Sequence, residues 1–205
     1  MTTTSRKGKK MEKKNLIYSD IVFRSAEGET ESREVEGIAS VFNQKTDLGW
    51  FTEEIDRGAF DGCDMTDVVL NFNHDNSMLL AGTRNGSLTL AVTDEGLLQR
   101  GTIIDTTQGR DVLKLLREGL ITKMSFAFTI DPDGGDEWIY ERGAEKEHRV
   151  IKKIKRLYDV SLVTFPAYEG TSVGMRSIDA VAEEHISLAK KRKEQDERMA
   201  KVLNG

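Results

Sequence analysis

The sequence predicts a single β-rich domain of the α+β class, and three observations support this. Between residues 15 and 165, short segments in which apolar and polar side chains alternate are separated by turn residues, which is typical of β-strands. Residues 105–119 have instead the spacing of an amphipathic helix. The 205 residues are 38% hydrophobic and 32% charged, which suits one core with a solvated tail.

Composition argues against several classes of protein. Residues 1–14 are basic but contain no apolar run, so they predict a flexible arm and not a signal peptide. No segment approaches the ~20 apolar residues of a membrane helix, and the net charge of -5 gives no global signal for nucleic acid. Cys63 is the only cysteine, which excludes an internal disulfide and a thiolate metal cluster. We expect a protein that stays in the cytoplasm of the cell that makes it.

The first part of the chain predicts an antiparallel pair. Residues 15–23 and 34–42 have strand patterns and are separated by the polar turn 26–32. Residues 43–64 predict an irregular segment with a short helical turn, and the acidic cluster of Glu53, Glu54 and Asp56 is expected to face solvent, with a role towards substrate as the alternative.

The middle of the chain predicts a strand, a hairpin and a helix. In the strand 67–74, alternation places His74 at the end of an apolar row of Val68, Leu70 and Phe72. Residues 86–92 and 96–104 predict a β-hairpin. The helix expected within 105–119 has capping oxygens at its start and Gly119 at its end.

The helix leads directly into residues 121–130, a predicted strand with Ser125 at its centre. Ser125 lies on the face with small or short neighbours, whereas Met124, Phe126 and Phe128 form the opposite, apolar face. Such a strand holds a hydroxyl rigidly at the edge of a core, which suits a nucleophile and equally suits a structural serine.

The last part of the chain predicts a surface excursion and a long strand. The excursion covers residues 131–147 and includes a short strand at 138–140. Residues 149–165 are rich in branched side chains, but the pattern slips at Lys152 and Lys153, which predicts a bulge or two abutting strands. Residues 177–205 predict a charged tail that is helical or disordered.

A serine nucleophile needs a base and a third group that orients the base. Of the three histidines, His148 lies in the charged excursion and His185 in the tail, so His74 is the preferred base. Asp159 is the candidate third member, because it interrupts an apolar strand where an unpaired carboxylate would be costly. An ion pair of Asp159 with one of the cations Lys123, Arg149 or Arg156 is the alternative at this stage.

Five motifs resemble the prohead maturation proteases of tailed bacteriophages, in the same order and at similar spacing. The resemblance covers about residues 15–176 and is carried by GAFD (58–61), NHD (73–75), GSLTL followed by DEGL (86–97), MSFAF (124–128) and DVSLVTFPAY (159–168).

This resemblance implies a fold, an activity and a site. The fold would be that of the herpesvirus assembly proteases, a closed, mostly antiparallel β-barrel of about seven strands flanked by helices. The activity would be that of a serine endopeptidase with the catalytic residues Ser125, His74 and Asp159 and no cofactor or metal. The family usually has glutamate where this chain has Asp159, one methylene shorter, and Ser161 is the nearest substitute acceptor. By position, the oxyanion donors would be backbone N–H groups of residues 169–171.

The resemblance also implies a setting. The substrates would be the phage capsid and scaffold proteins, cleaved in the host cytoplasm inside the assembling prohead. The domains would be a basic arm (1–14), a protease domain (15–176) and a tail (177–205) that is a possible site of self-cleavage. A homo-oligomer is possible, and no nucleic-acid or membrane partner is expected.

Two other classes of function compete with proteolysis. One is the same barrel with an inactive site, acting as a scaffold or capsid-assembly factor. The other is a metal-dependent hydrolase that uses His74 and Asp75, which is disfavoured because adjacent residues of a strand point to opposite faces.

Overall fold

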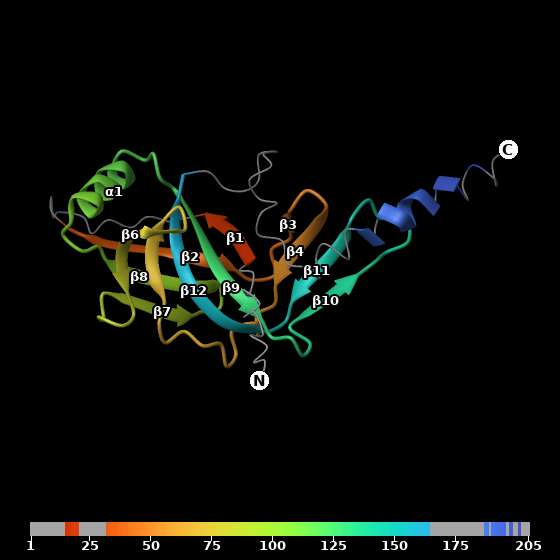
Figure 1. The fold of residues 1–205 in the computed structure, drawn as a ribbon, viewed down its shortest axis with the longest axis horizontal. Coiled ribbons are helices and arrows are strands. Elements are labelled where there is room, and N and C mark those ends of the chain that lie inside the picture. Colours follow the sequence, from red (N-terminus) through yellow and green to blue (C-terminus); the bar gives the residue numbers. More distant parts are fainter. Residues whose placement is uncertain are drawn as a thin grey trace, which may run out of the picture.

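The computed structural model describes residues 15–20 and 32–164, and in the C-terminal segment positions 187, 188, 190–195, 197, 198 and 201. Within these residues there are twelve strands and one helix between Thr107 and Arg117, α1. The described C-terminal positions are helical as well. Figure 1 shows α1 and this C-terminal stretch at opposite ends of an elongated molecule.

The strands form three sheets. The five-stranded sheet has the order β1-β9-β12-β5-β6, with the bounds Asn15–Asp20, Lys123–Ile130, Ile154–Val163, Val69–Phe72 and Asp75–Gly82. The four-stranded sheet has the order β10-β11-β4-β3, with the bounds Asp136–Ile139, Glu147–Ile151, Phe51–Ile55 and Thr46–Asp47. The three-stranded sheet has the order β2-β8-β7, with the bounds Glu34–Val41, Gly96–Thr102 and Leu88–Val92.

The expected closed barrel of about seven strands is wrong, although the described part of the chain is β-rich as predicted. The three sheets are open, and the largest begins at β1 and ends at β6 without joining them. Two pairings are parallel, β12 with β5 and β11 with β4. The strand pattern is interrupted between β11 and β12 at Lys152 and Lys153, and the two strands join different sheets, whereas a barrel is one sheet whose first and last strands pair.

Several local predictions are confirmed. The helix α1 begins after Thr106, whose side chain accepts a hydrogen bond from the backbone N–H of Gly109, and Gly119 follows its end with φ +70°. Strands β7 and β8 form the predicted hairpin. The predicted strand around Ser125 is β9, and the slip at Lys152 and Lys153 separates two strands.

Other local predictions need correction. Strand β1 pairs with β9 and β2 pairs with β8, so the expected antiparallel pair at the start of the chain is wrong. The segment predicted to be irregular contains β3 and β4, and β6 was not predicted. Apart from Ser32, the turn expected over 26–32 lies outside the described residues.

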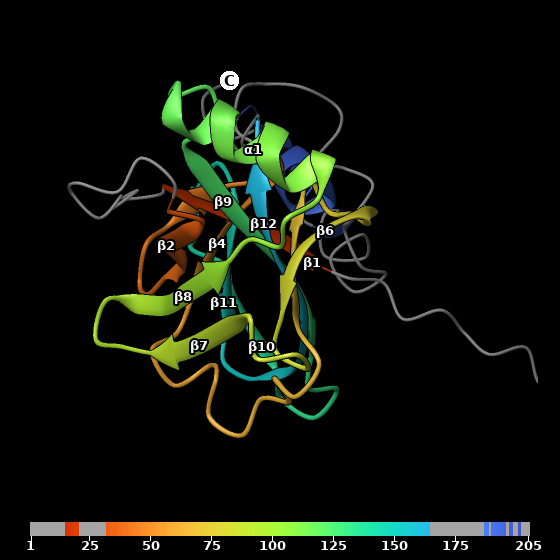
Figure 2. The ribbon, with the colours of Figure 1, turned by 90° about the vertical axis from the view of Figure 1, so that its left-hand side faces the viewer.

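The core lies between the five-stranded and three-stranded sheets, and α1 covers one end of it. Figure 2 shows α1 lying across the ends of β9, β12 and β6. Its buried side chains Val112, Leu113 and Leu116 join the same cluster as Phe126 and Phe128 of β9. The two phenylalanine rings stack with centroids 5.0 Å apart. The apolar face of β9 is therefore fixed in the core, and its other face is held in a defined place.

The four-stranded sheet is organised around a buried cation. Arg149 is 1% exposed and donates hydrogen bonds to Glu53, at 3.1 Å, and to Asp136, at 2.7 Å. From the C-terminal helical positions, Arg192 pairs with the buried Glu147. The prediction that residues 177–205 form a helical or disordered charged tail concerns residues that lie mostly outside the described part, but Arg192 contacts the four-stranded sheet.

None of the helices in the described residues has the length and hydropathy that are needed to span a bilayer.

Candidate active site

Ser125 lies on β9, between β1 and β12. Its neighbours Met124 and Phe126 point into the core cluster, so the Ser125 side chain points to the opposite face of the sheet. In the register of the sheet, Ser125 is opposite Ser161 of β12. Both serines are fully buried.

A β-bulge in β12 sets the direction of Asp159. The register with β9 shifts between Leu157 and Asp159, so these two residues do not share a face as simple alternation predicts. Leu157 joins the core cluster together with Val160 and Leu162. Asp159 and Ser161 point to the other face, towards the Ser125 side chain.

His74 lies in a tight turn. The prediction that it continues the apolar face of the strand 67–74 is wrong. Strands β5 and β6 are joined by the two-residue loop of Asn73 and His74, and Phe72 pairs with Asp75 across it. The φ angles are +53° at Asn73 and +57° at His74, and positive φ at both central residues is the requirement of a type I′ turn. The turn brings the imidazole onto the face of the sheet that carries Ser161.

Asn73 fastens this turn to β12. Its backbone N–H donates to the carbonyl of Leu162 at 2.9 Å, and its side-chain Oδ1 accepts from the backbone N–H of Thr164 at 3.0 Å. The left-handed conformation of His74 costs about 1–2 kcal/mol relative to ordinary backbone, and these bonds offset part of that cost. The dipeptide Asn-His between two strands was the signal in the sequence that could have identified the turn.

The turn brings the three predicted residues together. His74 Nε2 lies 2.7 Å from Ser125 Oγ, and His74 Nδ1 lies 2.7 Å from Asp159 Oδ1. The carboxylate can only accept a hydrogen bond, so Nδ1 carries the proton and the lone pair of Nε2 faces the serine hydroxyl. The side chain of Asp159 is 3% exposed and that of His74 is 15% exposed, so the contacts are largely shielded from water. This arrangement allows proton transfer from the hydroxyl to the imidazole.

The family model for caudovirus prohead serine proteases matches residues 19–184 of this chain. The chain belongs to this family. The prohead protease of Enterobacteria phage HK97 is 32% identical over 151 residues, which is 71% of this chain and 61% of that relative. The chain therefore spans about six-tenths of the length of the relative it matches. Among solved structures, the capsid assembly protease of bacteriophage T4 is similar over 74% of this chain and 98% of its own, with a TM-score of 0.45 and 12% identity.

Two of the cations considered as ion-pair partners of Asp159, Arg149 and Arg156, contact other carboxylates in this member of the prohead serine protease family. Arg149 bonds to Glu53 and Asp136 in the four-stranded sheet, and Arg156 lies 3.7 Å from Asp64. The contact of Asp159 with His74 is shorter than that of Arg156 with Asp64.

The metal-dependent alternative uses His74 and Asp75 as ligands. The carboxylate of Asp75 accepts hydrogen bonds from the backbone N–H and the hydroxyl of Ser77, and these bonds lower its pKa. Within the described residues, no cluster of three or more histidine, cysteine or acidic side chains is arranged to hold a metal ion.

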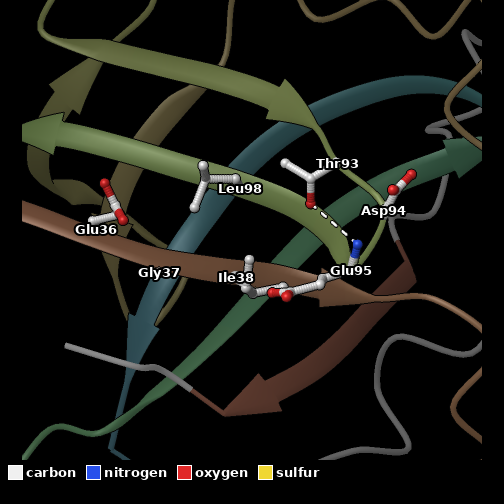
Figure 3. A pocket seen from close by; sticks show the side chains of 7 residues that line it. All are labelled: Glu36, Gly37, Ile38, Thr93, Asp94, Glu95 and Leu98. Atoms are coloured by element: carbon white, nitrogen blue, oxygen red, sulfur yellow. Dashed lines mark hydrogen bonds between the residues drawn. The ribbon is translucent and has the colours of Figure 1, made fainter. Parts of the chain in front are cut away.

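An open groove of about 390 Å³ lies on the three-stranded sheet of this family member (Figure 3). It is lined by residues of β2, β8 and the turn between β7 and β8, which are Glu36, Gly37, Ile38, Thr93, Asp94, Glu95 and Leu98. The hydroxyl of Thr93 donates to the carbonyl of Gly96 and accepts from the backbone N–H of Glu95, so it serves the turn. The groove shares no residue with the site around Ser125.

Proposed function

We propose that this member of the prohead serine protease family is a serine endopeptidase that cleaves capsid and scaffold proteins during prohead maturation, with Ser125, His74 and Asp159 as its catalytic residues. Membership of the family supports the reaction class and the setting. The observation that carries the assignment of residues is the imidazole of His74, whose two nitrogens lie 2.7 Å from the Ser125 hydroxyl and 2.7 Å from the Asp159 carboxylate.

In this mechanism, the first half of the reaction forms an acyl-enzyme. His74 Nε2 takes the proton of the Ser125 hydroxyl while Oγ bonds to the carbonyl carbon of the scissile peptide. Asp159 stabilises the imidazolium that forms and keeps the ring in the required tautomer. The proton on Nε2 then passes to the peptide nitrogen, the C–N bond breaks and the new amino terminus leaves.

The second half of the reaction restores the enzyme. Water gives a proton to His74 Nε2 and attacks the acyl carbon, the bond from Ser125 Oγ to carbon breaks, and the proton returns to Oγ. The residues 169–171, predicted to supply oxyanion donors, lie outside the described part of the chain.

The proposal extends to the setting of the reaction. The substrates are the phage major capsid protein and the scaffold, and the protease acts inside the assembling prohead. The chain is divided into a basic arm (1–14), a protease domain (15–176) and a tail (177–205). The tail is proposed as a site of self-cleavage.

Co-expression with the cognate capsid precursor tests the proposal. The wild type, Ser125→Ala and Ser40→Ala are each produced with the precursor, and all chains are weighed by mass spectrometry. Ser40 is a matched control, because it is also a fully buried strand serine but its hydroxyl has no hydrogen-bond partner among the described residues. We expect trimmed precursor and shortened protease with the wild type and Ser40→Ala, and intact chains with Ser125→Ala.

Three outcomes would contradict the proposal in different ways. Cleavage by Ser125→Ala would exclude Ser125 as the nucleophile. Intact precursor with the wild type, together with normal heads, would favour the non-enzymatic assembly factor. Loss of wild-type cleavage on addition of a chelator would favour a metal-dependent hydrolase.

A further inference from the structure

The hydroxyl of Ser161 lies at the centre of the candidate site, among four polar groups. It accepts a hydrogen bond from the backbone N–H of His74 at 3.2 Å and donates to Asp159 Oδ1 at 3.0 Å. It also lies 3.1 Å from His74 Nδ1 and contacts the side-chain amide of Asn71. Both Ser161 and Asn71 are fully buried, so these groups bond to one another and not to bulk water.

One hydroxyl proton cannot serve two acceptors. A serine hydroxyl has a single proton to donate and two lone pairs that accept. With the Asn71 Oδ1 facing it, Ser161 has two acceptors for that proton, Asp159 and Asn71. The Nδ2 of Asn71 is buried and has no hydrogen-bond partner among the residues that the structure describes. An amide turned by 180° presents Nδ2 to Ser161 at the same position, and the hydroxyl then accepts from two donors and gives its single proton to Asp159.

We propose that Ser161, held by the side-chain amide of Asn71, is a positioning residue for the reaction proposed above. In this arrangement Ser161 accepts from Asn71 Nδ2 and from the backbone of His74, and its own proton goes to Asp159. The inference rests on the proposed function, since it assigns Ser161 a role towards the catalytic pair of His74 and Asp159.

The position of Ser161 gives this role a physical basis. Asp159 Oδ1 receives two hydrogen bonds, from the imidazole and from Ser161, and two donors fix the plane of a carboxylate better than one. The bond to the backbone N–H of His74 acts on the turn itself, where a left-handed residue is held in an unfavourable conformation. Ser161 therefore couples the strand that carries the carboxylate to the turn that carries the imidazole.

Replacement of Ser161 separates positioning from folding. Ser161→Ala, Ser161→Thr and the matched control Ser40→Ala are compared for kcat and KM on the purified capsid precursor, and for the urea midpoint of unfolding. Loss of a hydrogen bond to a charged group predicts a ~10- to 100-fold lower kcat for Ser161→Ala with KM within about twofold. Ser161→Thr keeps the hydroxyl, and we expect it to recover most of kcat. A fluorophosphonate that labels Ser125 should react more slowly by the same factor.

Asn71→Ala provides a second test that leaves Ser161 in place. We expect a ~3- to 10-fold lower kcat, since a neutral hydrogen bond is lost, and this variant decides the question if Ser161→Ala fails to fold. A kcat of Ser161→Ala or Asn71→Ala equal to that of Ser40→Ala would overturn the inference while leaving the proposed function standing. Absence of cleavage by the wild type, or cleavage by Ser125→Ala, would overturn the proposed function itself.

Discussion

Replacement of Asp159 by asparagine removes the negative charge from the candidate site and nearly preserves its shape. Asp159 Oδ1 lies 2.7 Å from His74 Nδ1 and the side chain is 3% exposed. At an effective dielectric constant of about 20, two unit charges at this separation attract by about 6 kcal/mol. The attraction exists only after His74 has taken the proton, so it stabilises the transition state. The corresponding loss in kcat is ~10⁴-fold, which agrees with the effect of this change in serine proteases of other folds.

Replacement by glutamate keeps the charge and changes the reach. The additional methylene adds about 1.5 Å to the side chain, in a site where Asp159 already contacts His74 at 2.7 Å and Ser161 at 3.0 Å. We expect a ~10- to 100-fold lower kcat, because a displacement of about 1 Å of a catalytic group has an effect of this size. The kcat should therefore be highest for the wild type, lower for Asp159→Glu and lowest for Asp159→Asn.

The assay is the steady-state rate of precursor cleavage, with circular dichroism in urea to show that each variant is folded. Asp105→Asn is a suitable control, since Asp105 is an exposed carboxylate that also pairs with a cation, Arg110. If Asp159→Asn retained activity within about tenfold of the wild type, Asp159 would not be the third catalytic group and the electrostatic reasoning would be refuted.

Two further predictions concern the rest of the fold. Arg149→Met leaves Glu53 buried without the cation that contacts it, so the free energy of unfolding should fall by about 3–5 kcal/mol in urea titrations. The exposed Arg110→Met should change it by less than about 1 kcal/mol, and equal effects would contradict the role of burial. Burial raises the pKa of Cys63 from 9.0 to about 11. At pH 8 iodoacetamide should therefore alkylate the native protein about 100-fold more slowly than the urea-unfolded chain, whereas equal rates would show that the thiol is not shielded.

Local patterns in the sequence were sufficient where the interactions are local. The alternation in residues 121–130 predicted strand β9 and the face of Ser125, and Gly119 marked the end of α1. The charged pair Lys152 and Lys153 marked the break between β11 and β12. In each case the side chains that decide the structure are neighbours in the chain.

Alternation failed where the chain departs from a regular strand. The bulge between Leu157 and Asp159 places Leu157 on the core face and Asp159 on the other, although a period of two would put them together. His74 continues the apolar row of its strand in the sequence pattern, but the turn with positive φ at Asn73 and His74 carries it to the opposite face. After an inserted residue or a turn, each following side chain lies on the face opposite to the one that simple alternation predicts. The sequence pattern gives only weak signals for an insertion or a turn.

The sequence by itself determined that this protein is β-rich, which residues could act as nucleophile, base and orienting carboxylate, and which family it resembles. Only the tertiary structure decided that the strands form three open sheets, and that β12 lies between β9 and β5. That arrangement sets Asp159 and Ser161 beside Ser125 and beneath the turn of His74. The physical reason is that alternation specifies the faces of a strand but not its partners. The distances within the site depend on which strands pair and in which register.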